Sequence, residues 1–256
     1  MSKIMIDTNR KQLTLADARF YYDEQGNYVP SVTTILNAYP KGPEYYQWLK
    51  KVGMDADEIR DAAGERGSTV HNLTELYDEG QEVSLLTDNG GFKYRMDEWS
   101  MFEKYTTFVN KYNPVMLLSE QTFISQQLGF AGTIDRIMTI GMTNYLVDIK
   151  TSSSVWESYW LQLAAYKKLY EHCTKGGPEV LSIPIHGVAI LWLNAKTRTE
   201  GKNGAIQGEG WQLVIRDKKQ EHLDWEQFCH THVLWNAQNG DVKPKNLTYK
   251  LSHKKA

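Results

Sequence analysis

The feature that most constrains the fold is a change of sequence pattern at Pro114. Before it, apolar residues recur with the spacing of helices; after it, short runs rich in β-branched residues alternate with glycine-containing turns, which is typical of an antiparallel meander. The expected elements are, in order, a hairpin within 19–36, helices at about 44–52, 56–79 and 92–112, three strands between 115 and 152, a helix at about 155–172, strands near 185–194 and 211–216, and a helix at about 218–237. This order predicts an α/β fold, a mixed sheet flanked by helices, with an N-terminal helical region.

The chain of 256 residues shows no internal repeat and no low-complexity linker, so we interpret it as a single domain. Its parts are a hairpin and helical region at 19–112, a sheet with helices at 113–237, and a basic tail at 238–256. The tail includes five lysines and no acid from Lys243 onward. Both a solvated chain end and a segment that contacts a polyanion fit this pattern.

Composition excludes several classes of protein. The net charge of −2 is too small for uniform attraction to nucleic acid or to anionic membranes, although a local basic face remains compatible with it. Two cysteines without a CxxC pair exclude a disulfide framework, a zinc ribbon and a four-cysteine iron–sulfur cluster. No apolar run is long enough to span a bilayer, and the first residues lack the apolar core of a signal peptide. We expect a soluble, cytoplasmic protein with no membrane partner.

The strand that contains Leu146-Val-Asp-Ile-Lys150 carries charges where a core strand is expected. Side chains alternate between the faces of a strand, so Asp148 and Lys150 share one face. If the short Gly-Met-Thr-Asn turn joins this strand to the preceding one as a hairpin, the carboxylate of Asp135 approaches Asp148. A surface salt bridge between Asp148 and Lys150 would contribute only about 0 to 1 kcal/mol and would leave the second acid unexplained.

A divalent cation accounts for this grouping. Hard cations prefer oxygen ligands, so Asp135 and Asp148 can hold one or two Mg²⁺ or Mn²⁺ ions, and the backbone carbonyl of Ile149 can add another oxygen. Lys150 then serves to orient or activate a water, or to stabilise charge on a phosphate.

These residues lie in motifs of a known family. Gly-Thr-Ile-Asp135, followed thirteen residues later by Asp148-Ile-Lys150, resembles the core of the PD-(D/E)XK nuclease superfamily. Three further features resemble motifs of the RecB-like exonuclease branch of this superfamily. They are Gln162-Leu-Ala-Ala-Tyr166, Arg66-Gly-Ser-Thr-Val-His71, and Glu120 at the head of the strand before the turn. The stretch at 30–36 is similar to phage-encoded members and to the mitochondrial genome maintenance exonuclease. Ile134 replaces the proline that names the superfamily, and Ser68 replaces the usual threonine.

The resemblance implies a restriction-endonuclease-like fold and a metal-dependent deoxyribonuclease, most simply an exonuclease that acts on linear DNA in recombination, repair or degradation. It implies a catalytic set of Asp135, Asp148, Lys150, Gln162 and Tyr166, a metal-binding set of His71, Asp135, Asp148, Ile149 and Glu120 for Mg²⁺ or Mn²⁺, and substrate contacts from Arg66, Ser152, Ser153 and Ser154. A phage origin would place the protein in the host cytoplasm. A monomer and a homo-oligomer fit the sequence equally well.

Several residues have alternative interpretations. Glu75, one helical turn after His71, can bind metal or orient the imidazole. Gln162 and Tyr166 can fix helix against sheet, or hold the strand or a phosphate of the site. Trp156 and Trp160 can pack in a core or stack on bases.

The start of the helix after Lys150 has a pattern of its own. Ser154-Val-Trp-Glu157 has the form of a capping box, so Ser154 is the expected N-cap. The free N–H groups of that helix would then point toward the metal site, where a phosphate can sit.

Three further hypotheses compete with the nuclease. One is a zinc site built from His172, Cys173, Cys229, His230 and His232, although their spacing is not that of usual zinc sites. Another is a DNA-binding or assembly protein that keeps the fold without cleavage. The third is hydrolysis of RNA or of another phosphodiester.

Overall fold

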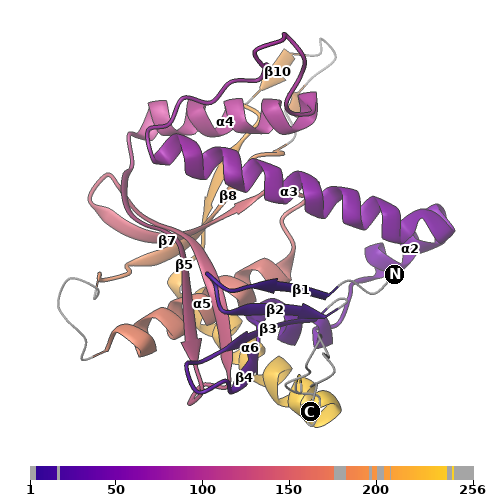
Figure 1. The fold of residues 1–256 in the computed structure, drawn as a ribbon, viewed down its shortest axis with the longest axis vertical. Coiled ribbons are helices and arrows are strands. Elements are labelled where there is room, and N and C mark those ends of the chain that lie inside the picture. The colour runs from indigo at the N-terminus through magenta and orange to yellow at the C-terminus, as the bar shows by residue number, and fades with distance from the viewer. Residues whose placement is uncertain are drawn as a thin grey trace, which may run out of the picture.

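A computed structural model describes residues 4–15, 18–175, 183–195, 198–200, 205–207, 209–240 and 244 (Figure 1). Its elements are β1 (Ile4–Asp7), β2 (Gln12–Leu15), β3 (Ala18–Tyr22), β4 (Tyr28–Pro30), α1 (Val32–Ile35), the 3₁₀ helix η1 (Leu36–Ala38), α2 (Pro43–Val52), the 3₁₀ helix η2 (Gly53–Asp55), α3 (Ala56–Asp78), α4 (Met96–Tyr112), β5 (Val115–Ser125), β6 (Phe130–Ile140), β7 (Thr143–Lys150), α5 (Glu157–Thr174), β8 (Gly187–Trp192), β9 (Arg198–Glu200), β10 (Ala205–Gln207), β11 (Gln212–Ile215) and α6 (Lys218–Asn239).

A five-stranded mixed sheet forms the centre of the molecule, in the order β11-β8-β7-β6-β5. Strands β5, β6 and β7 form the predicted antiparallel meander, and β8 runs parallel to β7. Parallel neighbours need a crossover connection, and α5 supplies it. The predicted α/β architecture, a mixed sheet flanked by helices with helices preceding it, is confirmed.

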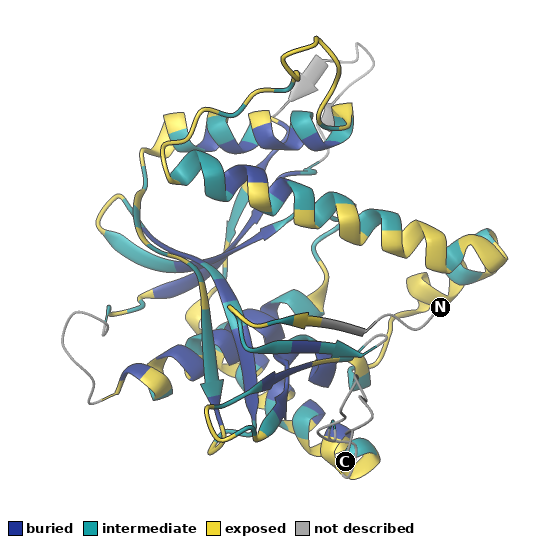
Figure 2. Ribbon diagram, in the orientation of Figure 1, coloured by how far each residue is buried: buried dark blue, intermediate teal, exposed yellow. Residues whose placement is uncertain are grey.

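Helices cover both faces of this sheet (Figure 1). Because side chains alternate along a strand, Leu146 of β7 packs in the cluster formed with α5 and α6, whereas Val147 and Ile149 pack in the cluster formed with α3 and α4. Figure 2 shows that the deepest burial lies in the central strands and on the helix faces that contact them.

An antiparallel sheet of β1 to β4 lies next to the central sheet. The sequence predicts only the β3–β4 hairpin, because β1 and β2 have four residues each, too few to establish a repeating pattern. A parallel bridge between Ser31 and Ala131 joins this sheet to β6, and the Tyr21 hydroxyl lies 3.1 Å from Thr133 Oγ1. These contacts place the N-terminal sheet beside the part of β6 where the candidate site forms.

Some predicted details are wrong or lie outside the described residues. Helix α5 begins at Glu157 after Trp156, not after Ser154, because the Ser152 hydroxyl donates to the Ser154 carbonyl and holds a bend there. The β9–β10 hairpin was not predicted. Of the basic tail at 238–256, only residues 238–240 and 244 are described. Within the described residues, none of the helices combines the length and the apolar character needed to cross a bilayer.

Candidate metal centre

A cavity of about 620 Å³ opens where β6 and β7 separate. The backbone ladder between these strands ends at Arg136 and Val147. Beyond that pair, Asp135 Oδ2 accepts the Ile149 N–H at 2.9 Å, so a side chain replaces the ladder. The predicted site residues that line the cavity are Arg66, His71, Glu120, Asp135, Asp148, Ile149, Lys150, Ser152, Gln162 and Tyr166.

Three potential ligands converge in this cavity: His71 from α3, Glu120 from β5 and Asp135 from β6. One ligand atom from each lies within 4.8 Å of the other two, and no other group of three or more such residues occurs in the described part of the chain. His71 Nδ1 is 3.5 Å from Asp135 Oδ2 and 3.7 Å from Glu120 Oε1. A histidine nitrogen with two carboxylates is a donor set that divalent ions such as Mn²⁺ accept.

The orientation of His71 suits a ligand. Its Nε2 lies 2.8 Å from the Ile149 carbonyl oxygen, which can only accept, so Nε2 carries a hydrogen and donates. When Nδ1 loses its proton, its lone pair is directed at the carboxylates of Asp135 and Glu120. Hydrogen bonds of this kind fix the tautomer of metal-binding histidines.

The carboxylates give the cluster an excess of negative charge. Burial lowers the pKa of His71, but the charges of Asp135 and Glu120 raise it to about 9. Burial raises the pKa of Glu120, and the hydrogen bond and charge of His71, together with Arg136, outweigh this and lower it. A cation is therefore stabilised between these side chains.

Glu120 occupies an unusual backbone conformation. It lies in the middle of β5, not at its head as predicted, and its φ of 47° is in the left-handed region. Such a conformation is uncommon for residues other than glycine and is found at functional sites. Glu120 faces His71, and its carboxylate contacts Arg136 at 3.3 Å and Arg10 at 3.4 Å.

Asp148 lies in the same cavity but is held by a second group of residues. Its Oδ2 forms an ion pair with Lys150 Nζ at 2.6 Å, and Gln162 Nε2 donates to its Oδ1 at 3.3 Å. Lys150 Nζ also donates to Gln162 Oε1 at 3.1 Å and lies 4.5 Å from the centre of the Tyr159 ring. Burial raises the pKa of Asp148 to about 6, although Lys150 lowers it. Asp148 and Lys150 thus share a face, as the strand pattern predicts.

Gln162 and Tyr166 connect α5 to this second group. Gln162 Nε2 lies 3.2 Å from the Tyr166 hydroxyl, so the two side chains act together. A Cβ atom on Gly132 would be 2.3 Å from Tyr166 Cε1, so only glycine allows the ring to approach β6 this closely. The pair therefore fixes α5 against the strands and also orients Asp148 and Lys150.

The predicted substrate contacts are only partly in the cavity. Arg66 and Ser152 line it, and Arg66 Nη2 donates to the Thr151 carbonyl at 3.5 Å. Ser153 and Ser154 lie outside the lining, because the bend at 152–154 directs the chain away.

The structure separates several of the alternative interpretations of individual residues. Glu75 lines the cavity without joining the three converging ligands. Trp160 is buried in the core, as expected for packing, whereas Trp156 is exposed. The zinc hypothesis is wrong, because no such cluster forms among the described residues, which include every histidine and cysteine it requires.

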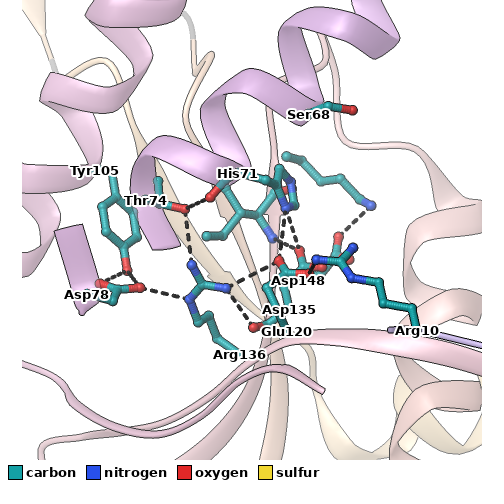
Figure 3. A network of polar contacts seen from close by, with 12 residues as sticks. Arg10, Ser68, His71, Thr74, Asp78, Tyr105, Glu120, Asp135, Arg136 and Asp148 are labelled. Carbon is teal, nitrogen blue, oxygen red and sulfur yellow. Dashed lines mark hydrogen bonds and ion pairs between the residues drawn. The ribbon is translucent and has the colours of Figure 1, made fainter. Parts of the chain in front are cut away.

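Other residues around the site were not predicted from the sequence. Arg10 and Arg19 of the N-terminal sheet line the cavity. Arg136 contacts Glu120, and Figure 3 shows it between Asp78 and the converging ligands. A signal for Arg136 was present: an arginine between Asp135 and the apolar Ile137 on a strand needs a buried partner.

Comparison with known proteins adds little. No protein-family model matches the chain, and no curated protein is similar to it. Among solved structures, the protein named "Putative exonuclease" from Eubacterium rectale is similar, at 14% identity and a TM-score of 0.44, over 88% of this chain and 90% of that chain. The site itself must therefore support any functional conclusion.

Proposed function

We propose that this protein is a metal-dependent deoxyribonuclease that degrades linear DNA from its ends. The observation that supports it is the convergence of His71, Glu120 and Asp135 within 4.8 Å, in a cavity that also contains Lys150. The resemblance of these residues and of Gln162 and Tyr166 to the motifs of RecB-like exonucleases, noted above, favours DNA as the substrate.

The residues fit a divalent cation. His71 Nδ1, Glu120 and Asp135 would hold it, and Asp148 and the Ile149 carbonyl line the same cavity as further oxygen donors. The nitrogen ligand makes the site more favourable for Mn²⁺ than an all-oxygen site would be. Such an ion lowers the pKa of a bound water and neutralises charge that develops on a phosphate.

The chain supplies the remaining groups. Lys150 is held by Asp148 and Gln162 with its ammonium group in the cavity, where it positions a water or stabilises phosphate charge. Arg66, Arg10 and Arg19 also line the cavity and would attract the DNA backbone. Three arginines close to the metal site would let a protein with a net charge of −2 bind a polyanion once a divalent cation offsets the carboxylates.

The test is incubation of linear and circular DNA, each single- and double-stranded, with Mg²⁺ or Mn²⁺. We expect linear DNA to be shortened and circular DNA to remain intact. Lys150→Ala and Asp148→Ala should each lower the rate by at least about 100-fold, because both remove charge from the reacting region.

The matched control is Lys168→Ala, which removes an exposed lysine of α5 that pairs with Glu171 outside the cavity. Its rate should equal that of the parent. Absence of cleavage by the parent with either metal, or undiminished cleavage by both site variants, would refute the nuclease proposal. RNA is incubated in parallel, and cleavage of RNA alone would instead identify a ribonuclease.

A further inference from the structure

Arg136 is the largest fully buried side chain in the described part of the protein. It projects from β6 toward α3, and its side chain is 0% exposed. Burying a guanidinium is unfavourable unless charged and polar partners compensate it. Those partners therefore show what the arginine holds in place.

The hydrogen-bond partners of Arg136 lie on two sides of its guanidinium (Figure 3). On one side, Nε donates to Asp78 Oδ2 at 2.8 Å, and the Tyr105 hydroxyl donates to the same carboxylate at 2.7 Å. On the other side, Nη1 contacts Glu120 Oε1 at 3.3 Å and donates to the Asp135 carbonyl at 2.8 Å. One guanidinium thus joins Asp78 to two of the converging ligands.

The third ligand is reached through Thr74. Arg136 Nη2 donates to Thr74 Oγ1 at 3.2 Å, and this hydroxyl donates to the His71 carbonyl at 2.8 Å, on the same turn of α3. The planar guanidinium has its donors in a fixed geometry, so it can set the relative positions of α3, β5 and β6. Lysine offers the same charge without this geometry.

We propose that Arg136 is a positioning residue that holds His71, Glu120 and Asp135 in the geometry that binds the divalent cation. This inference rests on the proposed metal site. Glu120 has the greatest need of such support, because its φ of 47° persists only where its surroundings enforce it. Outer partners of metal ligands typically change metal affinity by about 10- to 100-fold.

A purely structural role is the competing explanation, in which Arg136 only anchors α3 to the sheet. Metal binding separates the two explanations. We would measure Mn²⁺ affinity by titration calorimetry and by loss of the free Mn²⁺ paramagnetic resonance signal, neither of which needs activity. Arg136→Lys and Thr74→Val should each weaken Mn²⁺ binding about 10-fold or more, and DNA cleavage should recover as Mn²⁺ is raised.

Thr69→Val is the matched control for Thr74→Val. Thr69 is on the same helix, and its hydroxyl likewise donates to a helix carbonyl, that of Glu65, but it lies outside the network and the cavity. It should lose the same kind of hydrogen bond without any change in Mn²⁺ affinity. Circular dichroism establishes that each variant is folded; if Arg136→Lys does not fold, Thr74→Val alone decides.

The outcomes distinguish this inference from the proposed function. Parental Mn²⁺ affinity in a folded Thr74→Val or Arg136→Lys variant overturns the positioning role, whatever the parent does to DNA. Mn²⁺ binding by the parent that the variants weaken, without DNA cleavage, supports the positioning role and refutes the nuclease. A parent that binds no Mn²⁺ overturns both.

Discussion

Arg216 and Arg136 each pair with a largely buried carboxylate, and they differ in what else the guanidinium contacts. At the β11 end of the sheet, Arg216 binds both oxygens of Asp224, at 2.8 and 2.7 Å, and stacks on Trp160 at 4.8 Å. Its Nη2 also contacts the exposed Glu157 at 3.3 Å, so this cluster ends at the surface of the protein, and we call it the closed cluster. The guanidinium of Arg136 is instead shared between Asp78 and Glu120, and Glu120 continues into the cavity.

This difference distinguishes charged groups that stabilise the fold from charged groups that bind a ligand. A closed, bidentate pair satisfies its own donors and acceptors and makes no demand for a ligand. The open cluster presents two carboxylates and an imidazole that all face one point, an arrangement that is costly unless a cation joins it. We therefore expect substitutions in the closed cluster to change stability, and those in the open cluster to change activity.

The largest expected effect is that of Asp135→Asn. Asparagine keeps an acceptor for the Ile149 N–H but loses the ligand charge, so DNA cleavage should fall by about 1000-fold. The free energy of unfolding should change by less than about 1 kcal/mol. Initial rates on linear DNA with Mn²⁺, beside urea unfolding, check this. A loss of stability that accounts for the loss of rate would contradict the proposed distinction.

The reverse result is expected for Asp224→Asn. This substitution removes the buried charge that Arg216 pairs with and leaves it the exposed Glu157, so it should lower the free energy of unfolding by about 3 kcal/mol. Cleavage per folded molecule should stay unchanged, because the pair lies outside the cavity. Glu226→Gln is the control on the same helix, since Glu226 is exposed and pairs with the exposed His222. An equal loss of stability in both variants would show that the Arg216–Asp224 pair stabilises the fold no more than an exposed charge does.

The smallest expected effect concerns pH in the metal-free protein. The pKa of His71 is raised from its ordinary 6.5 to about 9, so the folded state binds the proton more tightly than the unfolded state. The stability from this proton is complete below pH 6.5 and is lost as pH rises toward 9. We expect a decline of about 2 kcal/mol in EDTA, less than the full shift implies because the ring is partly exposed.

His71→Gln should remove most of that decline, because glutamine does not titrate. Unfolding by urea at several pH values between 6 and 9 measures it. The closed cluster contains no histidine, so Asp224→Asn should keep the parental pH dependence. A decline of the same size in His71→Gln would assign the titration to another group.

The elements themselves were largely predictable. Apolar periodicity located α3, α4, α5 and α6 and the strands of the meander, because long segments in contact with a core repeat its spacing. Short elements were not: β1 and β2 have only four residues each, and the bend at 152–154 depends on one hydroxyl that competes with the expected cap at Ser154.

Local relations within the site follow from the order of residues alone. Strand alternation places Asp148 with Lys150, and helical spacing places Gln162 with Tyr166, because these periods are properties of the backbone alone. Only the tertiary structure decided which side chains converge. The separation of β6 from β7 joins Asp135 to His71 and Glu120, leaves Asp148 paired with Lys150, and brings Arg136 beneath them. Such distances depend on strand curvature and helix packing, which no local pattern encodes.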